Sequence, residues 1–263
     1  MEKAFKYRIY PNKAQNQILT QTFGCVRFVY NYYLNKRIEV YKTDKVSRPI
    51  QGRILSVTVS QTPSGKYYAS ICCTEVIQNL LLKTNKSVGC DLGIKDFLIF
   101  SDSSDSIKNS RFLEKDLKKL ARLQRELSRK TINSSNWNKA RVKVAKRYDK
   151  IQNKRKDFLH KLSTKINTDY DVICIENLNV SSMIKHHKLA RNIADVSWSE
   201  FVRQLCYKAV WYGKQIVKVN RFFASSQICH VCGYQNPDLK DLSIRSWICP
   251  ECKTLHDRDK TVQ

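Results

Sequence analysis

Four cysteines late in the chain constrain the fold more than any other feature of the sequence. Cys229 and Cys232 form one Cys-x2-Cys pair, Cys249 and Cys252 form a second, and sixteen residues separate the pairs. Two pairs with this spacing can place four thiolates around one Zn²⁺ ion, and the length between them suits a β-ribbon. Four cysteine ligands leave no open coordination position. The zinc is therefore expected to be structural and to hold together a module too small for a core of its own.

The remaining cysteines and two nearby histidines are given smaller roles. In a chain without a visible secretory signal, ten cysteines indicate metal ligands and buried thiols rather than a disulfide framework. His230 and His256 are only spare candidates for the metal. No apolar stretch approaches the length of about 18 residues that spans a bilayer, so we expect no membrane partner and a reducing, cytoplasmic location in a prokaryote. The six cysteines interpreted as packing residues are Cys25, Cys72, Cys73, Cys90, Cys174 and Cys206.

The net charge indicates a polyanionic partner. The 263 residues contain 48 Lys and Arg against 23 Asp and Glu, which leaves a charge of +25 that cannot be paired within the chain. A hydrophobic content of 42% is enough for a buried core, so the composition excludes a disordered chain. Nucleic acid is the partner that fits best, and an anionic membrane surface is the alternative.

The first eighty residues predict a small domain of strands with a helical segment. Residues 3–10 alternate as a short strand, and apolar residues at near-helical spacing follow between positions 23 and 41. The run around Leu55 alternates apolar and polar side chains, and Pro-Ser-Gly at 63–65 forms a turn before a second such run. A β-hairpin is therefore expected over 53–71.

Residues 86–220 have the order of a mixed α/β domain. Apolar runs typical of strands alternate with longer segments of helical periodicity, and this order predicts a sheet with helices packed on it. The predicted elements are two strands within 86–100, two helices within 111–167 separated by a polar break at 131–136, a strand at 170–176, a helix at 196–212 and a strand at 215–219.

The two helices predicted within 111–167 carry much of the positive charge. This segment has 19 Lys and Arg against 5 Asp and Glu, a net charge of +14. A charge run is usually a solvated helix face, but a run of nearly one sign favours a surface that binds phosphates. The residues predicted to contact nucleic acid are Lys118, Lys119, Arg122, Arg125, Arg129, Lys143, Lys146, Arg147, Lys154 and Arg155.

Two acidic residues stand in apolar strands, where a lone charge is costly. Asp91 follows Val88-Gly89-Cys90, and Glu176 ends the run Val172–Ile175. Burying an unpaired carboxylate costs several kcal/mol, so such acids are expected to have a partner. Carboxylates that share divalent cations meet this condition, and three of them can hold the two metal ions that hydrolyse a phosphodiester. A carboxylate that caps a helix or pairs with an arginine is the alternative for either residue.

Several motifs together resemble the TnpB proteins of insertion sequences, which are related to type V CRISPR nucleases. The motifs are Asp-Leu-Gly-Ile-Lys-Asp-Phe at 91–97, Ile-Glu-Asn-Leu-Asn-Val at 175–180, the four cysteines, His-Asp-Arg-Asp at 256–259, Tyr-Arg-Ile-Tyr-Pro at 7–11 and Asn-Tyr-Tyr-Leu-Asn-Lys-Arg at 31–37. The resemblance implies an α/β fold with an RNase H-like (RuvC) mixed sheet and helices, an inserted zinc ribbon, and an amino-terminal β-barrel-like domain that carries a helical recognition lobe. It also implies a guide RNA derived from the transposon end and a target DNA with a short adjacent motif.

Carried over to this sequence, the resemblance assigns the catalytic residues. Asp91 matches the first acid of the RuvC-like site, Glu176 the second and Asp259 the third. Asp257 is the weaker candidate for the third position, because the family's last acid follows the arginine. The three acids are expected to bind two Mg²⁺ ions that activate water for phosphodiester hydrolysis. The basic helices within 111–167 are expected to lie along the RNA–DNA heteroduplex or a displaced strand as electrostatic contacts.

The sequence departs from the family in two places. Members usually continue with Asn-Ala-Ala and a closing helix where Thr261-Val262-Gln263 stand here, and they have a much longer segment before the hairpin at 53–71. We therefore expect a shortened copy with a reduced recognition lobe. The expected parts are a wedge-like amino-terminal domain at 1–80, the nuclease domain with the basic helical hairpin at 86–220, the zinc ribbon at 221–255 and a truncated third RuvC motif at 256–263.

Three hypotheses about function stay open at this point. The first is a transposon-encoded, RNA-guided DNA endonuclease that uses divalent metal ions. The second is a nuclease-impaired protein that binds RNA and DNA and represses transcription. The departures from the family favour this second hypothesis, although Asp91 and Glu176 are both present. The third is a decayed fragment without a stable fold, which a cooperative thermal transition would contradict.

Overall fold

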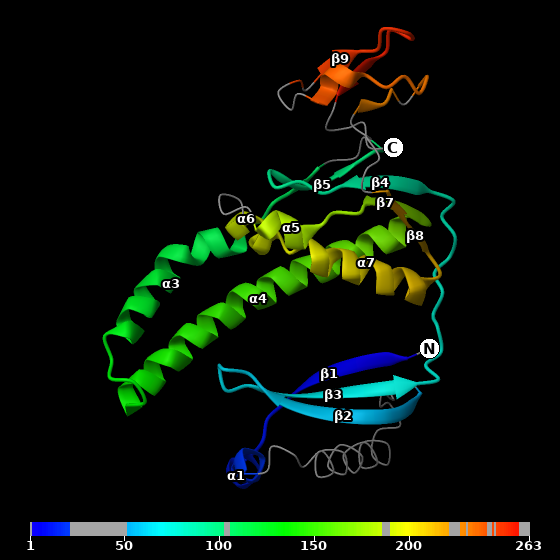
Figure 1. Cartoon of the computed structure of the whole chain (residues 1–263). Coiled ribbons are helices and arrows are strands. Elements are labelled where there is room, and N and C mark those ends of the chain that lie inside the picture. Colours follow the sequence, from blue (N-terminus) through cyan, green and yellow to red (C-terminus); the bar gives the residue numbers. More distant parts are fainter. Residues whose placement is uncertain are drawn as a thin grey trace. The chain divides into compact units, whose positions relative to one another are not determined.

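The computed structural model describes residues 2–21, 52–102, 106–185, 190–220, 227–229, 231–240, 244 and 246–257. The chain forms two units (Figure 1). The first contains the described residues of 1–78 together with 119–150, and the second contains those of 79–118 together with 151–263. The helices α3 (Phe112–Ser128) and α4 (Ser135–Asp169) each contribute residues to both units.

The first unit is built on a three-stranded antiparallel sheet. Its elements are β1 (Lys3–Ile9), α1 (Lys13–Gln21), β2 (Arg53–Gln61) and β3 (Tyr67–Thr74). The order β1-β3-β2 places the first strand beside the third, and the predicted strand at 3–10 is thereby confirmed. One face of the sheet is apolar, and its buried side chains pack with Leu19 of α1.

The hairpin predicted at 53–71 is confirmed with one correction. Gly65 has the positive φ, +84°, that its turn requires. The alternating pattern placed Leu55 among the core-facing residues, but its side chain is 54% exposed. The pairing register shifts between Ile54 and Ser56, so a β-bulge at this point turns Leu55 outward. Ile54 packs against the core instead.

Only part of the predicted amino-terminal domain lies within the described residues. α1 begins with a reciprocal cap, in which Asn12 Oδ1 accepts from the Gln15 backbone N–H at 2.8 Å and Gln15 Oε1 accepts from the Asn12 N–H at 3.0 Å. The helical segment predicted between 23 and 41 lies outside the described residues. The β-barrel-like closure is not seen in the described part of this unit, which forms a three-stranded sheet.

The second unit contains a five-stranded mixed sheet. Its strands are β4 (Ser87–Asp91), β5 (Asp96–Phe100), β6 (Ile107–Lys108), β7 (Val172–Glu176) and β8 (Gln215–Val219). In the order β6-β5-β4-β7-β8, the central strand β4 pairs antiparallel with β5 and parallel with β7, and β8 continues the parallel part. The mixed α/β sheet expected from the sequence is confirmed.

Helices connect the parallel strands of this sheet, because a parallel pair needs a long crossover. The two helices predicted within 111–167 are α3 and α4, and the polar break lies between them. Two further helices, of five and seven residues, are too short to show periodicity and were not predicted. None of the described helices is long and apolar enough to cross a membrane. The remaining helices are α5 (Val180–Ile184), α6 (Ala190–Val196) and α7 (Trp198–Tyr212).

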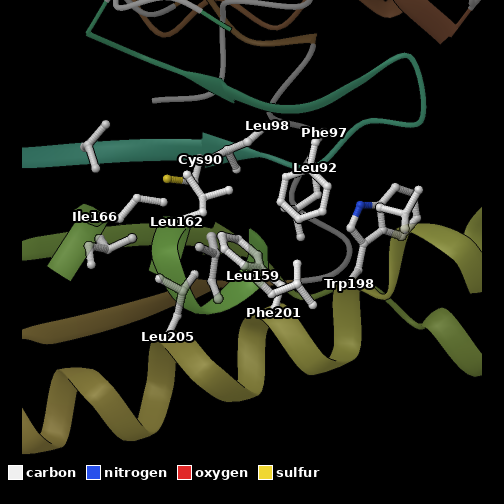
Figure 2. Packing of buried hydrophobic residues seen from close by; sticks show 14 of the residues in the cluster. Cys90, Leu92, Phe97, Leu98, Leu159, Leu162, Ile166, Trp198, Phe201 and Leu205 are labelled. Atoms are coloured by element: carbon white, nitrogen blue, oxygen red, sulfur yellow. The ribbon is translucent and has the colours of Figure 1, made fainter. Parts of the chain in front are cut away.

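The core of the second unit lies between the sheet and the helices α4 and α7 (Figure 2). Phe97 of β5 is in edge-to-face contact with Phe158 of α4, at a centroid distance of 5.2 Å, and with Phe201 of α7, at 5.0 Å. Alternate residues of β4 and β7 are buried in this core, which fixes the face that each remaining side chain of these strands occupies. The side chains that the two strands contribute to this core are Val88, Cys90, Ile173 and Ile175.

A small module with its own cluster of buried side chains follows the sheet in sequence. Its elements are the 3-10 helix η2 (Pro237–Lys240) and the antiparallel strands β9 (Ser246–Ile248) and β10 (Leu255–Asp257). Leu239 and Trp247 are buried there together with Cys229 and Cys249. The predicted β-ribbon is confirmed, but its second strand follows the last cysteine rather than lying between the two cysteine pairs.

A buried ion pair links the segment before β4 to the starts of the parallel strands β7 and β8. The Lys214 side chain is 1% exposed and pairs with Asp171, and its Nζ also donates to the Leu82 carbonyl at 2.9 Å. Asp171 accepts the backbone N–H groups of Thr84 and Asn85 at 2.8 Å and 2.6 Å. The hydrogen bond from Lys214 and these N–H groups hold the pKa of Asp171 well below its usual range.

We predict that Asp171→Asn lowers the free energy of unfolding near neutral pH, because it leaves the Lys214 ammonium buried without a carboxylate. A carboxyl group with a lowered folded-state pKa stabilises above its ordinary pKa of about 4 and loses that contribution as the pH falls below it. The difference between wild type and variant, measured by urea denaturation, should therefore shrink between about pH 5 and pH 3. Asp157→Asn, which removes the exposed pair with Lys161, is the control and should have little effect.

Candidate active site and metal centre

The register of two parallel strands brings Asp91 and Glu176 together. Cys90 of β4 is the partner of Ile175 of β7, and each acid is the next residue on its strand. Adjacent strands lie about 4.8 Å apart, so the two acids end neighbouring strands at the same level of the same sheet edge. Residues separated by 85 positions in the sequence become neighbours in this way.

The acids do not lie in the hydrophobic core, which corrects the environment expected from the sequence. Cys90 and Ile175 are fully buried on the face that packs against the helices. Since successive residues of a strand point to opposite faces, Asp91 and Glu176 belong to the other face, and both are half-buried. The apolar sequence around each acid reflects burial of its neighbours, and the carboxylates keep access to solvent and to a ligand.

The residues Leu92 and Gly93 that follow the first acid are required by the turn between β4 and β5. Leu92 is buried in the core, and the chain turns directly after it toward β5. A Cβ atom on Gly93 would lie 2.6 Å from the Asp96 carbonyl oxygen, closer than real side chains approach. This turn therefore needs glycine, and it allows β5 to return beside the strand that ends in Asp91.

Cys90 precedes Asp91 on β4, but its side chain lies on the opposite face of the sheet, in the core. Burial raises the pKa of its thiol to about 12, with a further contribution from Cys174, Asp102 and Asp91. A thiol with this pKa stays protonated at neutral pH, so Cys90 acts as a small apolar residue, as the sequence predicted.

The third predicted acid, Asp259, lies outside the described residues. The backbone of Asp257 belongs to β10, where it pairs with Ser246. The structure thus brings two of the three predicted acids together, at one end of the parallel strands. Two carboxylates at one edge are suited to binding a divalent cation through oxygen atoms.

The four predicted metal ligands converge in the small module. Their sulfur atoms all lie within 4.8 Å of one another, with Cys229 and Cys252 at 3.4 Å and Cys232 and Cys249 at 3.5 Å. Zinc–sulfur bonds of about 2.3 Å in a tetrahedron place the sulfurs ~3.8 Å apart, so the cluster matches a four-thiolate metal site. Within the part of the chain that the structure describes, the cysteines meet as the sequence predicted.

The two loops that carry the cysteine pairs have equivalent backbone hydrogen bonds. Cys229 N–H donates to the Tyr234 carbonyl at 2.8 Å, and Cys249 N–H donates to the Thr254 carbonyl at 2.9 Å. In each loop the fourth residue after the first cysteine has positive φ, +79° at Gly233 and +58° at Lys253. The first loop has the residue type suited to this conformation, and the second holds a lysine in it.

His256 has a role that the sequence only weakly indicated. Its side chain is 1% exposed, its Nε2 lies 3.1 Å from the sulfur of Cys229, and its ring stacks on Trp247 with centroids 4.7 Å apart. An imidazole N–H beside a thiolate ligand is a typical outer contact of a metal site. The motif that begins at position 256 therefore contributes its histidine to the metal module, which extends to Asp257 in the structure.

Most of the predicted nucleic-acid-binding residues are solvent-exposed. In α3 the spacing of Lys118, Arg122 and Arg125 places them on one side of the helix, and Arg129 follows directly after its last residue. Arg147 and Arg155 are half-buried, unlike the other eight. The eight exposed residues are Lys118, Lys119, Arg122, Arg125, Arg129, Lys143, Lys146 and Lys154.

Arg155 has a structural setting that the charge pattern did not indicate. Its guanidinium pairs with Asp195 of α6, and the two side chains are 21% and 10% exposed. The same carboxylate accepts the backbone N–H of Leu113 at 3.1 Å, in the first turn of α3. Arg155 therefore links α4, α6 and the start of α3, whereas Lys154 points to solvent.

Family models match most of this chain. The OrfB_IS605 model, described as "Probable transposase", matches residues 70–197, which include both adjacent acids. A model described as "Helix-turn-helix domain" of the same group matches residues 1–45, and one described as "Cas12f1-like, TNB domain" matches residues 198–261, which include the four cysteines.

Curated relatives decide the family. A protein of Streptomyces pristinaespiralis named "Putative RNA-guided DNA endonuclease" is 30% identical over 353 residues, covering 98% of this chain and 87% of the relative. The chain belongs to the TnpB family. A second relative, "Putative RNA-guided DNA endonuclease InsQ" of Escherichia coli K12, is 36% identical over 203 residues and covers 72% of this chain. "TnpB-like protein L770" of Acanthamoeba polyphaga mimivirus is 25% identical over 237 residues and covers 84% of this chain.

This TnpB-family chain is shorter than its relatives. It spans 50% of the Escherichia coli protein and 44% of the mimivirus protein. The match to the Streptomyces protein extends over 353 residues, more than the 263 of this chain, so that relative contains segments without a counterpart here. This agrees with the shortened copy expected from the sequence.

Solved structures give a weaker match. The chain resembles the protein in "Cryo-EM structure of the Cas12f1-sgRNA-target DNA complex" with a TM-score of 0.45 and 16% identity, over 78% of this chain and 54% of that one. It resembles the protein in "Cryo-EM structure of CRISPR-Cas12f Ternary Complex" with a TM-score of 0.47 and 17% identity, over 78% and 43%.

We predict that Arg155→Ala destabilises this TnpB-family protein by roughly 2 kcal/mol or more, because the half-buried Asp195 loses its cation. Lys154→Ala removes the same charge from the adjacent exposed position and should change the free energy of unfolding by less than about 0.5 kcal/mol. Urea denaturation of both variants measures the difference. Equal effects of the two substitutions would refute the structural role of Arg155.

Proposed function

We propose that this chain is a transposon-encoded, RNA-guided DNA endonuclease with a RuvC-like site formed by Asp91, Glu176 and Asp259. The observation that carries the proposal is the pairing of β4 with β7, which sets Asp91 beside Glu176 in a member of the TnpB family. The names of the Streptomyces and Escherichia coli relatives support the reaction class. The substrate is then a DNA phosphodiester.

The proposed catalytic residues act as oxygen ligands for Mg²⁺. Asp91 and Glu176 fit this role because they are adjacent, half-buried carboxylates at one sheet edge, and hard divalent cations prefer oxygen ligands. Two Mg²⁺ ions held by these carboxylates would supply an activated water and neutralise charge on the phosphate. The rigid strands hold the carboxylates at fixed positions, and the turn at Gly93 returns the chain so that Ile99 of β5 pairs with Asp91. Asp259 is proposed as the third ligand on the family motif alone.

The proposed cofactor of the small module is a structural Zn²⁺ held by Cys229, Cys232, Cys249 and Cys252. The donor set fits zinc, because four sulfurs gather within tetrahedral distances and His256 hydrogen-bonds one of them. The buried cluster of this module has few apolar residues of its own, so the metal supplies much of its folding energy.

The proposed partners are a guide RNA derived from the transposon end and a target DNA. The eight exposed basic residues, which lie in α3, in α4 and at Arg129 just after α3, are suited to contact phosphates, and the net charge of +25 favours a polyanion. The division into an amino-terminal domain at 1–80, a nuclease domain at 86–220, a zinc ribbon at 221–255 and a third motif at 256–263 is part of this proposal, as is a location in the prokaryotic cytoplasm.

A cleavage assay tests the proposed reaction. The protein is expressed together with the DNA downstream of its gene, and the RNA that copurifies with it is sequenced. A plasmid that matches the guide segment of this RNA should be cut in Mg²⁺, and Asp91→Ala or Glu176→Gln should reduce the rate by at least a hundredfold, as loss of a metal ligand predicts. Asp169→Asn, at an exposed acid of α4, is the matched control and should cut at the wild-type rate.

The rival functions give different results in the same assay. A nuclease-impaired repressor binds RNA and the matched plasmid but leaves the plasmid intact in Mg²⁺. A decayed fragment shows no cooperative thermal transition and copurifies with no defined RNA. Equal cutting by wild type and Asp91→Ala would show that the activity does not come from this site.

We predict that the purified protein contains one zinc ion per chain and that Cys229→Ser loses it. Replacing one thiolate ligand removes a strong zinc–sulfur bond, so the small module should unfold while the five-stranded sheet stays folded. Elemental analysis measures the metal, and protease digestion measures exposure of the module. Cys206→Ser, at a half-buried cysteine of α7 outside the cluster, should leave the zinc content unchanged.

A further inference from the structure

An open groove of about 420 Å³ runs along the second half of α4. Its floor is apolar and includes Ile107 of β6, Phe112 at the start of α3 and Phe158 of α4. Its rim is formed by Lys154, Lys161 and Lys165, all on α4. All of these residues belong to the second unit. None of them was assigned to the metal sites, and of the basic residues that the charge pattern singled out only Lys154 is among them.

The floor offers aromatic surface to a ligand. The rings of Phe112 and Phe158 are edge to face with centroids 5.8 Å apart, and both side chains are half-buried. Phe158 is held in place by Phe97, whose ring lies 5.2 Å away in the core. The floor is therefore fixed by the core, and its outer surface stays accessible within the groove.

The rim of the groove is positively charged. Lys154, Lys161 and Lys165 are exposed, and they follow one another along α4 at intervals of seven and four residues. With a rise of about 1.5 Å per residue, they span ~16 Å of the helix. The acid that lines the groove, Asp157, pairs with Lys161 at 2.8 Å. The groove thus has a net positive rim above an apolar, aromatic floor.

We propose that this groove binds an unpaired stretch of single-stranded DNA, with bases against the aromatic floor and phosphates along the lysine rim. Stacking on aromatic rings combined with a basic edge is the usual chemistry of sequence-tolerant binding to single strands. Duplex nucleic acid is excluded from the floor, because its bases are stacked on one another and present only their edges. The groove volume is of the size that holds a small ligand, which suits one or two bases.

The chemistry of the lining favours DNA over RNA. A protein that selects RNA does so by hydrogen bonds to the 2′-hydroxyl. The polar side chains of this groove are the three lysines and Asp157, and the carboxylate is already paired with Lys161. An apolar floor without a neutral hydrogen-bonding side chain suits deoxyribose and the thymine methyl group. This inference rests on the proposed function, in which the DNA strand is the substrate, and it adds a binding site away from the acids.

The test measures binding without guide RNA and without added Mg²⁺, so that it does not depend on cleavage. Fluorescence anisotropy with a labelled twelve-nucleotide oligo(dT) gives the affinity of the zinc-loaded full chain. The double variant Lys161→Ala, Lys165→Ala should weaken binding at least tenfold. The double variant Lys150→Ala, Lys156→Ala removes the same charge from exposed positions of α4 outside the groove and should weaken binding less than threefold.

A substitution in the floor separates stacking from charge. Phe112→Leu keeps an apolar side chain at the floor but removes the ring, so it should weaken binding to oligo(dT) about fivefold and leave binding to a duplex of the same length unchanged. Its thermal transition should stay within a few degrees of wild type. If Phe112→Leu fails to fold, crosslinking of wild type replaces it, with 5-iododeoxyuridine in the oligonucleotide and mass spectrometry of the peptide. Crosslinks are expected at Phe112, Phe158 or the adjacent residues of α4.

Three outcomes overturn the inference. The first is an equal loss of affinity for oligo(dT) in the groove and control double variants. The second is tighter binding of oligo(U) than of oligo(dT). The third is a set of crosslinks that lies entirely outside the groove. The result is independent of the catalytic proposal. Because the binding assay contains no Mg²⁺ and no guide RNA, a protein that fails to cut DNA can still show the groove to be occupied. If the protein cuts DNA but shows no crosslinks in the groove, the proposed binding site is refuted and the proposed catalytic function is not.

Discussion

The in-register parallel pairing of β4 and β7 is the constraint on which the second unit depends. It sets Cys90 opposite Ile175, and these two side chains help to bury one face of the sheet against α4 and α7. The same register places the next residue of each strand, Asp91 and Glu176, together on the opposite face. One set of backbone hydrogen bonds therefore decides both where the core lies and where two carboxylates meet.

The excess positive charge of the chain is used in two ways. Most basic residues of α3 and α4 stay in solvent, where they add little to stability and are available to an anion. Lys214 and Arg155 are instead drawn inward, each against a carboxylate that also accepts backbone N–H groups. Asp171 and Asp195 thus tie connecting segments to the sheet and to α3.

In the small module and in the groove on α4, a small cluster of apolar side chains is enough to hold the site residues in place. Cys229, Cys249, Trp247 and Leu239 make up the buried cluster of the module, and matching hydrogen bonds in its two loops hold the cysteine backbones in place. In the groove, Phe158 is fixed from behind by Phe97 of the core. In both places a rigid backbone or core holds the groups that meet a ligand.

The sequence by itself predicted most of the element types and the cysteine cluster, and it singled out the two acids, Asp91 and Glu176, that the structure brings together. Periodicity predicted the hairpin, four of the five strands of the mixed sheet and the helices α3, α4 and α7, whereas the two-residue strand β6 is too short to show a pattern. Only the tertiary structure decided that Leu55 leaves the core at a bulge, that His256 supports the metal cluster and that Arg155 pairs with Asp195. These outcomes depend on register and on contacts between residues far apart in sequence, which a local pattern does not contain.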